Sequence, residues 1–580
     1  MNPFGVHMAS WWYPDVYYMH SFDWVANLTK IHGAHTMKFG FERRTHDWNN
    51  TVGPGPKEEI AFNGQYTGIG VGDFLEGWPD ESNTEGYGDF VPRANLGAPW
   101  TDFFAQDDWK VNSRLTVNLG LRYDLIAPHG GRNHLMTTFD LATGKVVVAG
   151  SQLSPQYTNQ AVVAAYPNEF TTAAAVGWPQ NTMIFEGKKD FSPRVGFAWR
   201  PWAGNKTVVR GGYGIFYETT GDVDDMYYQI QSPYEVGANS MVNTTPYPTR
   251  SIADPYALMT GGGPAPVGRL TDFYWDPHQP WPSMQQANLG MEHELPWGLI
   301  VEGNLQYQHT IHLENGYNFN ESKPGQPNVI PYPDFTTEYD AGRLGWVDDA
   351  YSRYYAFELE VRKTARHYTF MISNVWAKEI NGAPMWPSAG DLFQGPSGYI
   401  PDELKVNFVV DVPMGKGRKF LNHGGVVDAV LGGWETGTIM ILHQDGDPLT
   451  VTTYIPYVDD NVNHTGNPNR VCSGRVSHPT ITDWINPNCF VAPTIPSWGN
   501  SGTGIIFGPG RSVLGDWSLY KNFTLHERIK LQARGELFNV FNHPYWADPN
   551  TSWPSPGVFG TITARELTPR VVQFAMRLTF

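Results

Sequence analysis

Hydrophobic and polar residues alternate with a period of two along many short stretches of this chain. Between residues 115 and 123, the apolar positions are Leu115, Val117, Leu119, Leu121 and Tyr123, and the positions between them are Thr116, Asn118, Gly120 and Arg122. Because successive side chains of a β-strand point to opposite sides, this alternation predicts a strand with one apolar and one polar face.

The alternating stretches occur in pairs joined by short turns, which is typical of β-hairpins. We predict seven hairpins, with strands over residues 22–29 and 35–44, 103–110 and 115–123, 192–200 and 207–218, 284–295 and 299–309, 354–363 and 368–377, 402–412 and 434–443, and 517–525 and 529–541; an unpaired strand follows over 570–580. Connections such as 127–190 and 219–282 are far longer than the roughly 12 to 15 residues of structureless loops in compact domains. A transmembrane barrel, with short turns on one rim and long loops on the other, is expected to have this asymmetry.

Charged residues of both signs gather opposite the apolar faces. In the last strand Val572, Phe574, Met576, Leu578 and Phe580 share one side. The residues that we predict to point into a barrel lumen are Arg122, Glu358, Glu360, Arg362, Arg534, Glu536 and Arg577. A water-filled or plugged interior tolerates such charges, whereas a dry core would have to pair each of them. Asp107 and Asn374 are exceptions on predicted apolar faces, and a soluble antiparallel sheet with one wet face would give the same alternation.

Composition narrows the class of protein. The 580 residues include 61 Gly and 45 Pro, which disfavours a helical protein, and the net charge of −17 argues against nucleic-acid binding, which needs clustered Lys and Arg. No stretch approaches the roughly 18 to 20 apolar residues of a membrane helix. The first twenty residues contain no Lys or Arg and no apolar core, so they do not resemble a signal peptide.

Catalytic and metal-binding motifs are not evident, and we predict no enzyme activity, no cofactor and no metal site. Two groups of loop residues have the oxygen ligands that Ca²⁺ favours but lack a full loop pattern: Asp222, Asp224 and Asp225, and Asp459, Asp460, Asn461 and Asn463. His32 and His35 flank a hairpin turn, where a surface role is expected. The only cysteines, Cys472 and Cys489, would form a disulfide within one loop in an oxidising compartment.

Aromatic residues outside the strands are the candidate ligand contacts, because flat rings stack on sugars or on aromatic siderophores. They are Trp78, Trp178, Tyr274, Trp275, Trp281, Trp346, Trp386 and Trp498. Packing of the long loops against each other is the alternative role for these rings. A soluble carbohydrate-binding or glycoside-hydrolysing β-protein is the alternative function; a hydrolase of this kind would need two carboxylates across a cleft.

Several segments resemble a known family. Residues 103–123, 191–199 and 209–217 look like the barrel of TonB-dependent outer-membrane receptors. Residues 433–439, 517–523, 537–544 and the terminal Phe580 resemble the Oar-like subgroup, whose members have a carboxypeptidase-regulatory-like domain before the plug. The similarity extends from about Phe22 to the end of the chain.

The resemblance implies an all-β, antiparallel transmembrane barrel, with about 15 strands of a 22-stranded barrel, long external loops and short periplasmic turns. We expect residues 1–21 to be an irregular start belonging to an external loop and residues 22–580 to be the C-terminal part of the barrel, without plug, TonB box or signal peptide. The implied role is ligand capture and TonB-dependent uptake at the outer membrane of a Gram-negative bacterium.

The resemblance also implies the partners. These are outer-membrane lipid, the barrel-assembly machinery, the TonB complex through a plug that is not in this chain, and an unknown small-molecule, peptide or oligosaccharide ligand. The residues that resemble the assembly signal are Phe574, Met576, Leu578 and Phe580.

Overall fold

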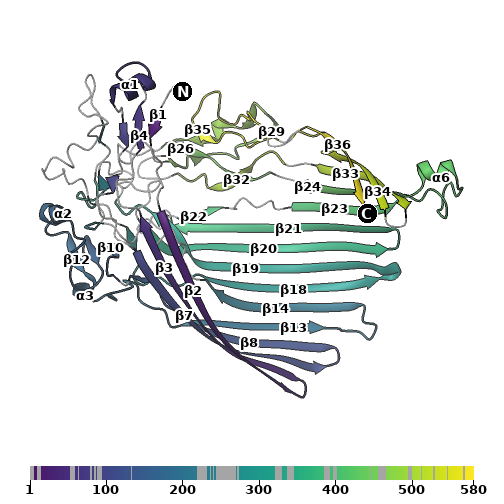
Figure 1. Cartoon of the computed structure of the whole chain (residues 1–580), viewed down its shortest axis with the longest axis horizontal. Helices are drawn as coiled ribbons and strands as arrows, with labels where there is room; N and C mark the ends of the chain where they lie inside the picture. Colours follow the sequence, from purple (N-terminus) through teal and green to yellow (C-terminus); the bar gives the residue numbers. More distant parts are fainter. Residues whose placement is uncertain are drawn as a thin grey trace.

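A single large antiparallel sheet dominates the structure (Figure 1). The computed structural model describes residues 6–8, 15–52, 59–62, 64–78, 81–83, 86–87, 94–131, 133–218, 232–234, 237–238, 241–242, 270, 273–320, 329–335, 345–384, 392–395, 402–443, 446–454, 465–493, 499–510, 513–526, 529–544, 546–565 and 569–580. In these residues the sheet has 18 strands, of which three are short additions at its margin, so fifteen form the body.

The fifteen strands follow one another in chain order, each paired with the next. They are β2 (Asp15–His32), β3 (His35–Val52), β7 (Ala94–Asn112), β8 (Leu115–Ile126), β13 (Asp190–Trp199), β14 (Thr207–Tyr217), β18 (Ser283–Leu295), β19 (Leu299–Tyr317), β20 (Gly345–Ala365), β21 (Tyr368–Pro384), β23 (Asp402–Asp411), β24 (Trp434–His443), β33 (Leu514–His526), β34 (Ile529–Phe538) and β36 (Val571–Thr579). The short additions are β9 (Gly130–Gly131), β17 (Tyr274–Trp275) and β22 (Leu392–Gly395).

The body of the sheet is open along two edges in the described part of the chain. β2 pairs with β3 on one side only, and β36 pairs with β34 on one side only. An unpaired edge presents a row of free backbone N–H and C=O groups, so each edge is ready to pair with a further strand.

All seven predicted hairpins and the final strand are present, which confirms the predicted fold class. Many strands are longer than predicted, mainly at the end where the long connections begin. β2 begins at Asp15, within the segment predicted to be irregular, and β20 begins at Gly345 rather than at Tyr354. The alternation of apolar and polar residues fades in these extensions, so the pattern did not reveal them.

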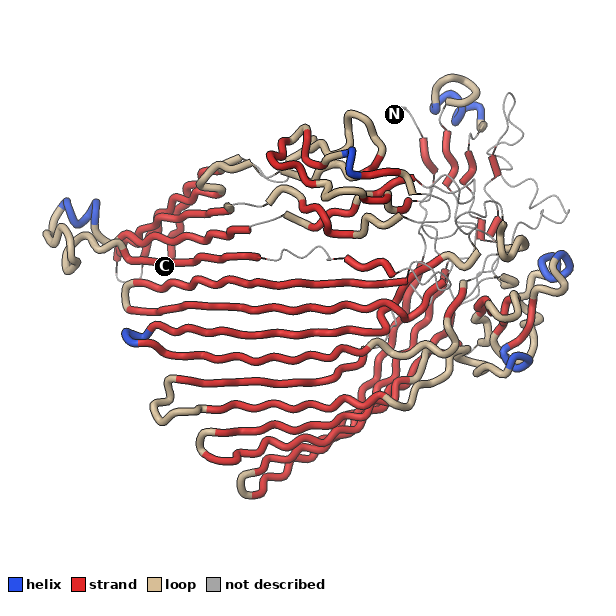
Figure 2. The backbone as a smooth tube through the Cα atoms, turned by 180° about the vertical axis from the view of Figure 1, so that it is seen from behind, coloured by secondary structure: helices blue, strands red, loops and turns tan. Residues whose placement is uncertain are grey.

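The connections divide between the two ends of the sheet (Figure 2). At one end, called the turn end below, neighbouring strands are joined by tight turns such as 33–34 and 113–114. Gly33 has a φ of +59°, which glycine adopts easily. The Asn112 side chain accepts hydrogen bonds from the N–H groups of Arg114 (2.8 Å) and Leu115 (3.0 Å), which fixes the turn between β7 and β8.

The long connections lie at the other end, called the loop end below, and contain most of the smaller elements. The small strands are β1 (Val6–Met8), β4 (Glu59–Phe62), β5 (Glu81–Asn83), β6 (Gly86–Tyr87), β10 (Thr137–Asp140), β11 (Lys145–Val148), β12 (Phe170–Thr172), β15 (Gly237–Ala238), β16 (Met241–Val242), β25 (Pro448–Thr450), β26 (Thr452–Tyr454), β27 (Thr465–Gly466), β28 (Asn469–Arg470), β29 (Arg475–Thr480), β30 (Asp483–Ile485), β31 (Phe490–Val491), β32 (Thr503–Phe507) and β35 (Ser552–Trp553).

Helices are few and short in the described residues, and none of them is long and apolar enough to cross a membrane. The α-helices are α1 (Gly70–Glu76), α2 (Gln160–Ala165), α3 (Ala173–Val176) and α6 (Val426–Leu431), and the 3₁₀ turns are Pro296–Gly298 and Pro487–Cys489. Unlike α1, α2 and α3, α6 lies at the turn end (Figure 1).

In the residues that the structure describes, the buried hydrophobic clusters lie mostly in the long connections rather than in the body of the sheet. Phe139 is fully buried, with Phe319 stacked on it at 4.5 Å between ring centroids and with Tyr332 and Phe335 edge-on at 4.7 Å. These rings come from the connection after β8 and the connection after β19. The two connections therefore form one packed body at the loop end.

Candidate functional site

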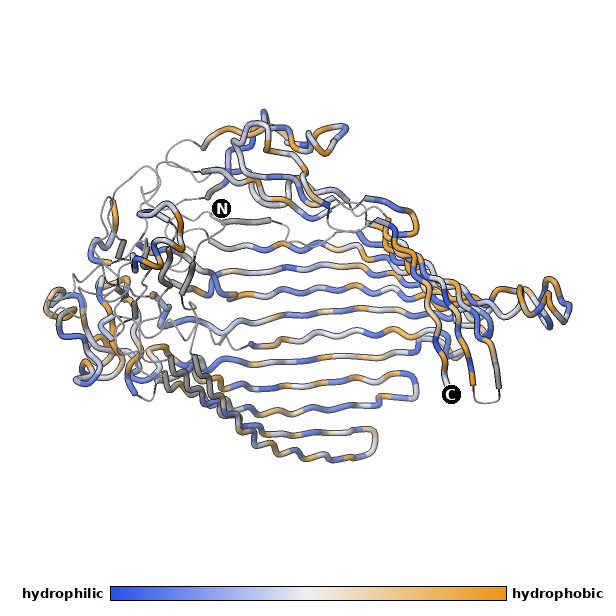
Figure 3. Tube along the Cα trace, turned by 45° about the horizontal axis from the view of Figure 1, so that its top comes forward, coloured by the Kyte–Doolittle hydropathy of each residue, from blue (hydrophilic) through white to orange (hydrophobic). Residues whose placement is uncertain are grey.

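Hydrophobic and polar residues alternate along the strands of the sheet (Figure 3), which places them on opposite faces. On one face large apolar side chains are about half exposed, for example Leu121 at 49%, Leu289 at 48% and Leu305 at 52%. The register places these residues on a common side, since Leu305 pairs with both Leu289 and Phe357. Soluble proteins rarely leave so extended an apolar surface uncovered, so this face is suited to lipid.

A row of four carboxylates crosses the opposite, polar face. Glu42 of β3 pairs in register with Asp102 of β7, Asp102 with Asp124 of β8, and Asp124 with Asp190 of β13. Like charges directly opposite each other destabilise a sheet. The row is therefore stable only if cations lie within it.

Arg122 supplies the cation at the centre of this row. Its Nε lies 2.6 Å from Asp124 Oδ1, its Nη1 lies 3.6 Å from Glu42 Oε2, and its Nη2 contacts Asp102. Because Arg122 is two positions before Asp124, its side chain emerges on the same face and its fork reaches three strands.

The network continues beyond Arg122 in both directions. Arg44 binds Asp23 Oδ1 at 2.8 Å and Glu42 Oε1 at 3.0 Å, which brings in the edge strand β2. On the other side, the Ser192 hydroxyl donates to Asp124 Oδ2 at 2.8 Å. A continuous polar network thus extends over β2, β3, β7, β8 and β13.

A second row of carboxylates repeats this arrangement. Glu292 of β18 pairs in register with Glu302 of β19, and Glu302 pairs with Glu360 of β20. Arg362 lies two positions after Glu360 and binds all three, with Nη2 2.7 Å from Glu292 Oε2 and Nη1 2.9 Å from Glu302 Oε2 and 2.5 Å from Glu360 Oε1. Charge-assisted, forked bonds of this kind are among the stronger hydrogen bonds in proteins.

A smaller group lies on the last strands. Arg534 binds Glu536 Oε1 at 3.3 Å and Gln532 Oε1 at 2.7 Å. Five of the seven charges predicted on the polar face, Arg122, Glu360, Arg362, Arg534 and Glu536, therefore form ion pairs there. Glu358 and Arg577 form no ion pair within the part of the chain that the structure describes.

The two predicted exceptions on the apolar face each contact a polar side chain of a neighbouring strand. Asp107 Oδ2 lies 2.7 Å from His35 Nδ1, next to the turn at 33–34, and Trp109 stacks on the same imidazole at 5.4 Å. Asn374 donates to Asp402 Oδ1 at 2.9 Å. The His35 imidazole therefore contacts both Asp107 and Trp109 next to the turn.

The aromatic ligand candidates in the described residues lie at the loop end, but three of them are buried, and Trp346 belongs to the extension of β20 and Trp275 to β17 rather than to loops. Trp275 and Trp346, exposed by 7% and 8%, pack with Phe273 in one cluster. Trp281, exposed by 6%, donates from Nε1 to the Ile126 carbonyl at 3.1 Å. These three rings pack loops together, which was the alternative role, and in this structure they offer no open surface to a ligand.

The remaining candidates are half-buried or lie outside the described residues. Trp178 packs at the margin of a cluster that includes Met136, and Tyr274 packs against the Phe139 core, where burial and nearby carboxylates raise its pKa. Trp78 meets Tyr66 edge-on at 6.1 Å. Trp386 and Trp498 fall outside the described residues, as do the two predicted Asp-rich groups.

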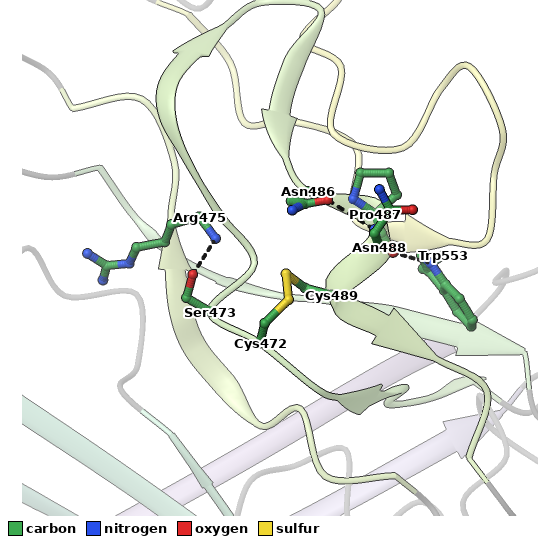
Figure 4. Close-up of a disulfide and its surroundings, with 8 residues drawn as sticks. All are labelled: Cys472, Ser473, Arg475, Asn486, Pro487, Asn488, Cys489 and Trp553. Atoms are coloured by element: carbon green, nitrogen blue, oxygen red, sulfur yellow. Dashed lines mark hydrogen bonds between the residues drawn. A yellow bond between two sulfur atoms is a disulfide. The ribbon is translucent and has the colours of Figure 1, made fainter.

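The connection after β24 packs with the connection after β34 into one unit, and Figure 4 shows its disulfide. It contains a disulfide between Cys472 and Cys489, whose Cα atoms are 4.8 Å apart. Cys489 lies in a core with Phe490, Ile506 and Phe559, the last from the connection after β34. The disulfide thus ties together an external unit whose core combines two connections.

Next to this core is a cavity of about 250 Å³ that the sequence did not reveal, lined in part by Arg475, Trp484 and Phe507. The Arg475 guanidinium lies 5.5 Å from the Phe507 ring centroid, and Trp484 Nε1 donates to the Phe507 carbonyl at 2.9 Å. Arg475 and Trp484 lie in a stretch without strong alternation, so no sequence pattern linked them with Phe507.

One histidine in the connection after β8 has a lowered pKa. His129 follows the end of β8, where burial and the charge of nearby His46 lower its pKa from 6.5 to about 4. No group of three or more His, Cys, Asp or Glu side chains in the described ranges is arranged to hold a metal ion.

The fold and its two faces are those of an outer-membrane barrel. The chain belongs to the family described as "Outer membrane beta barrel domain", which matches residues 2–573. A comparison with curated proteins finds no match. The protein is therefore an outer-membrane β-barrel protein of a Gram-negative bacterium, and the alternative of a soluble β-protein is not supported.

Similar solved structures are distant in sequence. The ferripyoverdine receptor of the outer membrane of Pseudomonas aeruginosa is 11% identical, with a TM-score of 0.45 and coverage of 99% of this chain and 52% of that chain. The outer membrane transporter YddB from Escherichia coli is 10% identical, with a TM-score of 0.45 and coverage of 97% and 54%. The FrpB iron transporter from Neisseria meningitidis is 9% identical, with a TM-score of 0.40 and coverage of 95% and 53%. The chain spans about half the length of these proteins.

Membership of this family assigns the surfaces. The apolar face contacts lipid, the polar face lines the lumen, the long connections are external and the short turns are periplasmic. The rows bridged by Arg122 and Arg362 are therefore lumenal.

Proposed function

We propose that this chain forms the barrel of a TonB-dependent receptor of the Oar-like kind, which captures a ligand at the cell surface and admits it through the lumen. The observation that carries the proposal is the lumenal surface itself, where Arg122 and Arg362 each bridge a row of carboxylates. A wide barrel leaves such charges either hydrated or paired with an enclosed domain. The sequence motifs that resemble the receptor family support the same proposal.

The charges on the lumenal face favour contact with a plug domain that can leave the lumen over packing against a fixed hydrophobic core. Asp190 is 8% exposed, and its Oδ2 has no hydrogen-bond partner in the described part of the chain. The rows contain more carboxylates than arginines, so a facing domain with Lys or Arg side chains would complete them. Such contacts can form and break as a plug moves, because polar interfaces exchange readily with water.

The external loops are the proposed place of ligand capture. Trp78, Trp178 and Tyr274 are partly exposed among the predicted aromatic contacts, and Trp386 and Trp498 stay predictions. The cavity beside Trp484 adds a cation and aromatic rings at the same end of the barrel. These features fit a ligand with flat or anionic groups, such as an oligosaccharide, a peptide or a small chelator.

The unpaired edges of β2 and β36 indicate where the barrel would be completed. We propose that further strands pair with β2 and β36 to complete a barrel of 22 strands around the plug. Electrophoretic mobility before and after heating separates a closed barrel from an open sheet, because closed barrels stay compact in detergent until heated.

The experiment refolds the 580-residue chain in detergent, alone and together with the polypeptide encoded directly upstream. The chain alone is expected to show no heat-modifiable species, and the combination is expected to show one. A compact, heat-modifiable species from the chain alone would contradict the proposal and indicate a smaller pore that closes by itself.

A further inference from the structure

One periplasmic connection differs from its neighbours. β23 and β24 are joined by residues 412–433, whereas β2 and β3 are joined by 33–34 and β20 and β21 by 366–367. The long connection contains α6, which projects beyond the end of the sheet (Figures 1 and 2). A hairpin of this kind does not need twenty residues to turn, so the insertion calls for another role.

The connection exposes a large share of its apolar side chains. None of the residues of α6 is buried, and Val426 is 80% exposed and Val430 58% exposed. The other exposed apolar residues of the connection are Met414, Phe420, Leu421, Val427 and Leu431. Such a cluster on a six-residue helix is unfavourable in water and favourable at a lipid surface.

Two residues of the lipid-facing surface hold α6 in place. Trp434 and Lys521 are opposite each other in register. Thr436 and Leu519, two positions along their strands, are the next pair on the same face, so all four side chains are on the apolar face. Lys521 Nζ donates to the Ala429 carbonyl at 2.6 Å, and Trp434 Nε1 donates to the Val430 carbonyl at 2.7 Å.

These bonds fix the side of the barrel on which α6 lies. They satisfy carbonyls in the last turn of the helix, and the ammonium complements the negative end of its dipole. Lys521 is only 5% exposed, so the contact with α6 covers a cation that would otherwise face lipid. The helix is therefore attached to the outer, lipid-facing side of the periplasmic rim.

The same connection contains two lysines that form no ion pair in the residues that the structure describes. Arg418 binds Asp411 Oδ2 at 2.8 Å, but Lys416 and Lys419 are exposed and form no ion pair in the described residues. Lys419 Nζ lies 5.4 Å from the ring centroid of Phe420, so charge and apolar surface are adjacent. The nearby carboxylate of Asp428 accepts from the backbone N–H of Lys416 at 2.7 Å.

We propose that residues 412–433 form an interfacial anchor in the periplasmic leaflet of the outer membrane. The apolar side chains of α6 and Phe420 enter the boundary between headgroups and acyl chains, and Lys416 and Lys419 bind the phosphate of anionic phospholipid headgroups. An apolar cluster flanked by basic residues and continuous with a lipid-facing surface has the chemistry of membrane-surface segments. The inference depends on membership of the outer-membrane family and not on the proposed receptor function.

Site-specific fluorescence quenching tests the anchor in the full chain, refolded together with the polypeptide encoded directly upstream so that the barrel can close. A bimane label is placed at Val426→Cys in vesicles of phosphatidylethanolamine and phosphatidylglycerol at a ratio of about 7:3, with small amounts of nitroxide lipid. Since Cys472 and Cys489 are paired, the introduced cysteine is the one that reacts. Leu121→Cys serves as the lipid-facing reference and Ser113→Cys, in another periplasmic turn, as the aqueous reference.

We expect the label at Val426→Cys to be quenched by acyl-chain nitroxides to nearly the same extent as the label at Leu121→Cys. Quenching no stronger than at Ser113→Cys would overturn the proposal and indicate that α6 contacts water, a periplasmic protein or a second copy. An unquenched label at Leu121→Cys would overturn the lipid-facing assignment on which the inference depends.

The headgroup preference is tested with the same label. Nitroxide phosphatidylglycerol is expected to quench more strongly than nitroxide phosphatidylcholine. The double variant K416Q/K419Q is expected to lower this relative affinity about twenty-five-fold, since each basic residue near an anionic surface contributes about a factor of five. Arg366→Gln, in the turn between β20 and β21, is the matched control and should leave the preference unchanged. Equal quenching by both lipids in the unmodified protein would contradict the binding of anionic headgroups.

Discussion

Arg362 and Glu292 are 70 residues apart in the chain, yet Nη2 of the arginine lies 2.7 Å from Oε2 of the glutamate. They come from strands that are not adjacent, because β19 lies between β18 and β20. The guanidinium reaches across the intervening Glu302 and joins three strands through one side chain. Arg122 does the same for the row on β3, β7 and β8.

Loss of Arg362 should destabilise the barrel wall. Arg362→Met leaves three glutamates in register without their shared cation, and we expect a loss of about 1 to 3 kcal/mol, since the site is partly hydrated. The urea midpoint, followed by tryptophan fluorescence in detergent, measures the effect. Arg577→Gln, at an exposed arginine that forms no ion pair in the described part of the chain, is the control and should change the midpoint little.

A second substitution separates charge repulsion from lost packing. Combining Arg362→Met with Glu302→Gln removes one of the opposed carboxylates, so part of the stability should return. If the double variant is as unstable as the single one, the carboxylate row is not the cause of the loss.

The disulfide should stabilise its external unit and leave the strands unaffected. Opening the bond between Cys472 and Cys489, which are separated by 17 positions, should lower stability by about 3 kcal/mol on the chain-entropy model. Peptide mass mapping without reductant should find the two cysteines linked. Two free thiols in protein recovered from the cell surface would refute the prediction, and Cys472→Ser should increase protease cleavage within residues 465–493 only.

Acid should weaken the packing of the loops through His129. Its pKa of about 4 in the folded protein lies below the ordinary value of 6.5, so its contribution to stability is complete above pH 6.5 and is lost as the pH falls toward 4. In that window only the unfolded chain takes up the proton. The expected loss is roughly 1 to 3 kcal/mol, measured as the change of the urea midpoint with pH.

His129→Gln should reduce this pH dependence, because glutamine does not titrate. The control is His134→Gln, at an exposed histidine of the same connection. A pH dependence that is the same in His129→Gln and in the unmodified protein would show that another group is responsible.

The end of the chain should be required for assembly. Phe574 is 84% and Met576 79% exposed on the edge strand β36, and Phe580, directly after this strand, is 92% exposed. We expect the barrel-assembly machinery to bind these side chains. Deleting Phe580 should lower the amount of protein in the outer-membrane fraction, whereas Phe580→Tyr, which keeps the terminal ring, should preserve it. Unchanged assembly after the deletion would count against a role as an assembly signal.

The sequence by itself determined the strands, their faces and the end at which the turns lie. Alternation such as that from Leu115 to Tyr123 depends only on the two-residue repeat of a strand, so it is visible locally. A turn such as that at Asn112 is likewise defined by neighbouring residues. For these reasons all seven hairpins could be predicted, while the outer strand extensions, which lack an apolar face, could not.

Only the tertiary structure decided which side chains meet. The rows bridged by Arg122 and Arg362 depend on the register of three or more strands, which is the sum of several turn lengths and is not a property of any one segment. Burial of Trp275, Trp281 and Trp346 depends on contacts with segments far away in the chain, so the exposure of these rings could not be predicted from the sequence. The position of α6 was likewise decided only by the tertiary structure. The helix lies on the lipid-facing side because it is bound there by Lys521, which is about ninety residues beyond the helix in the sequence and next to it in space.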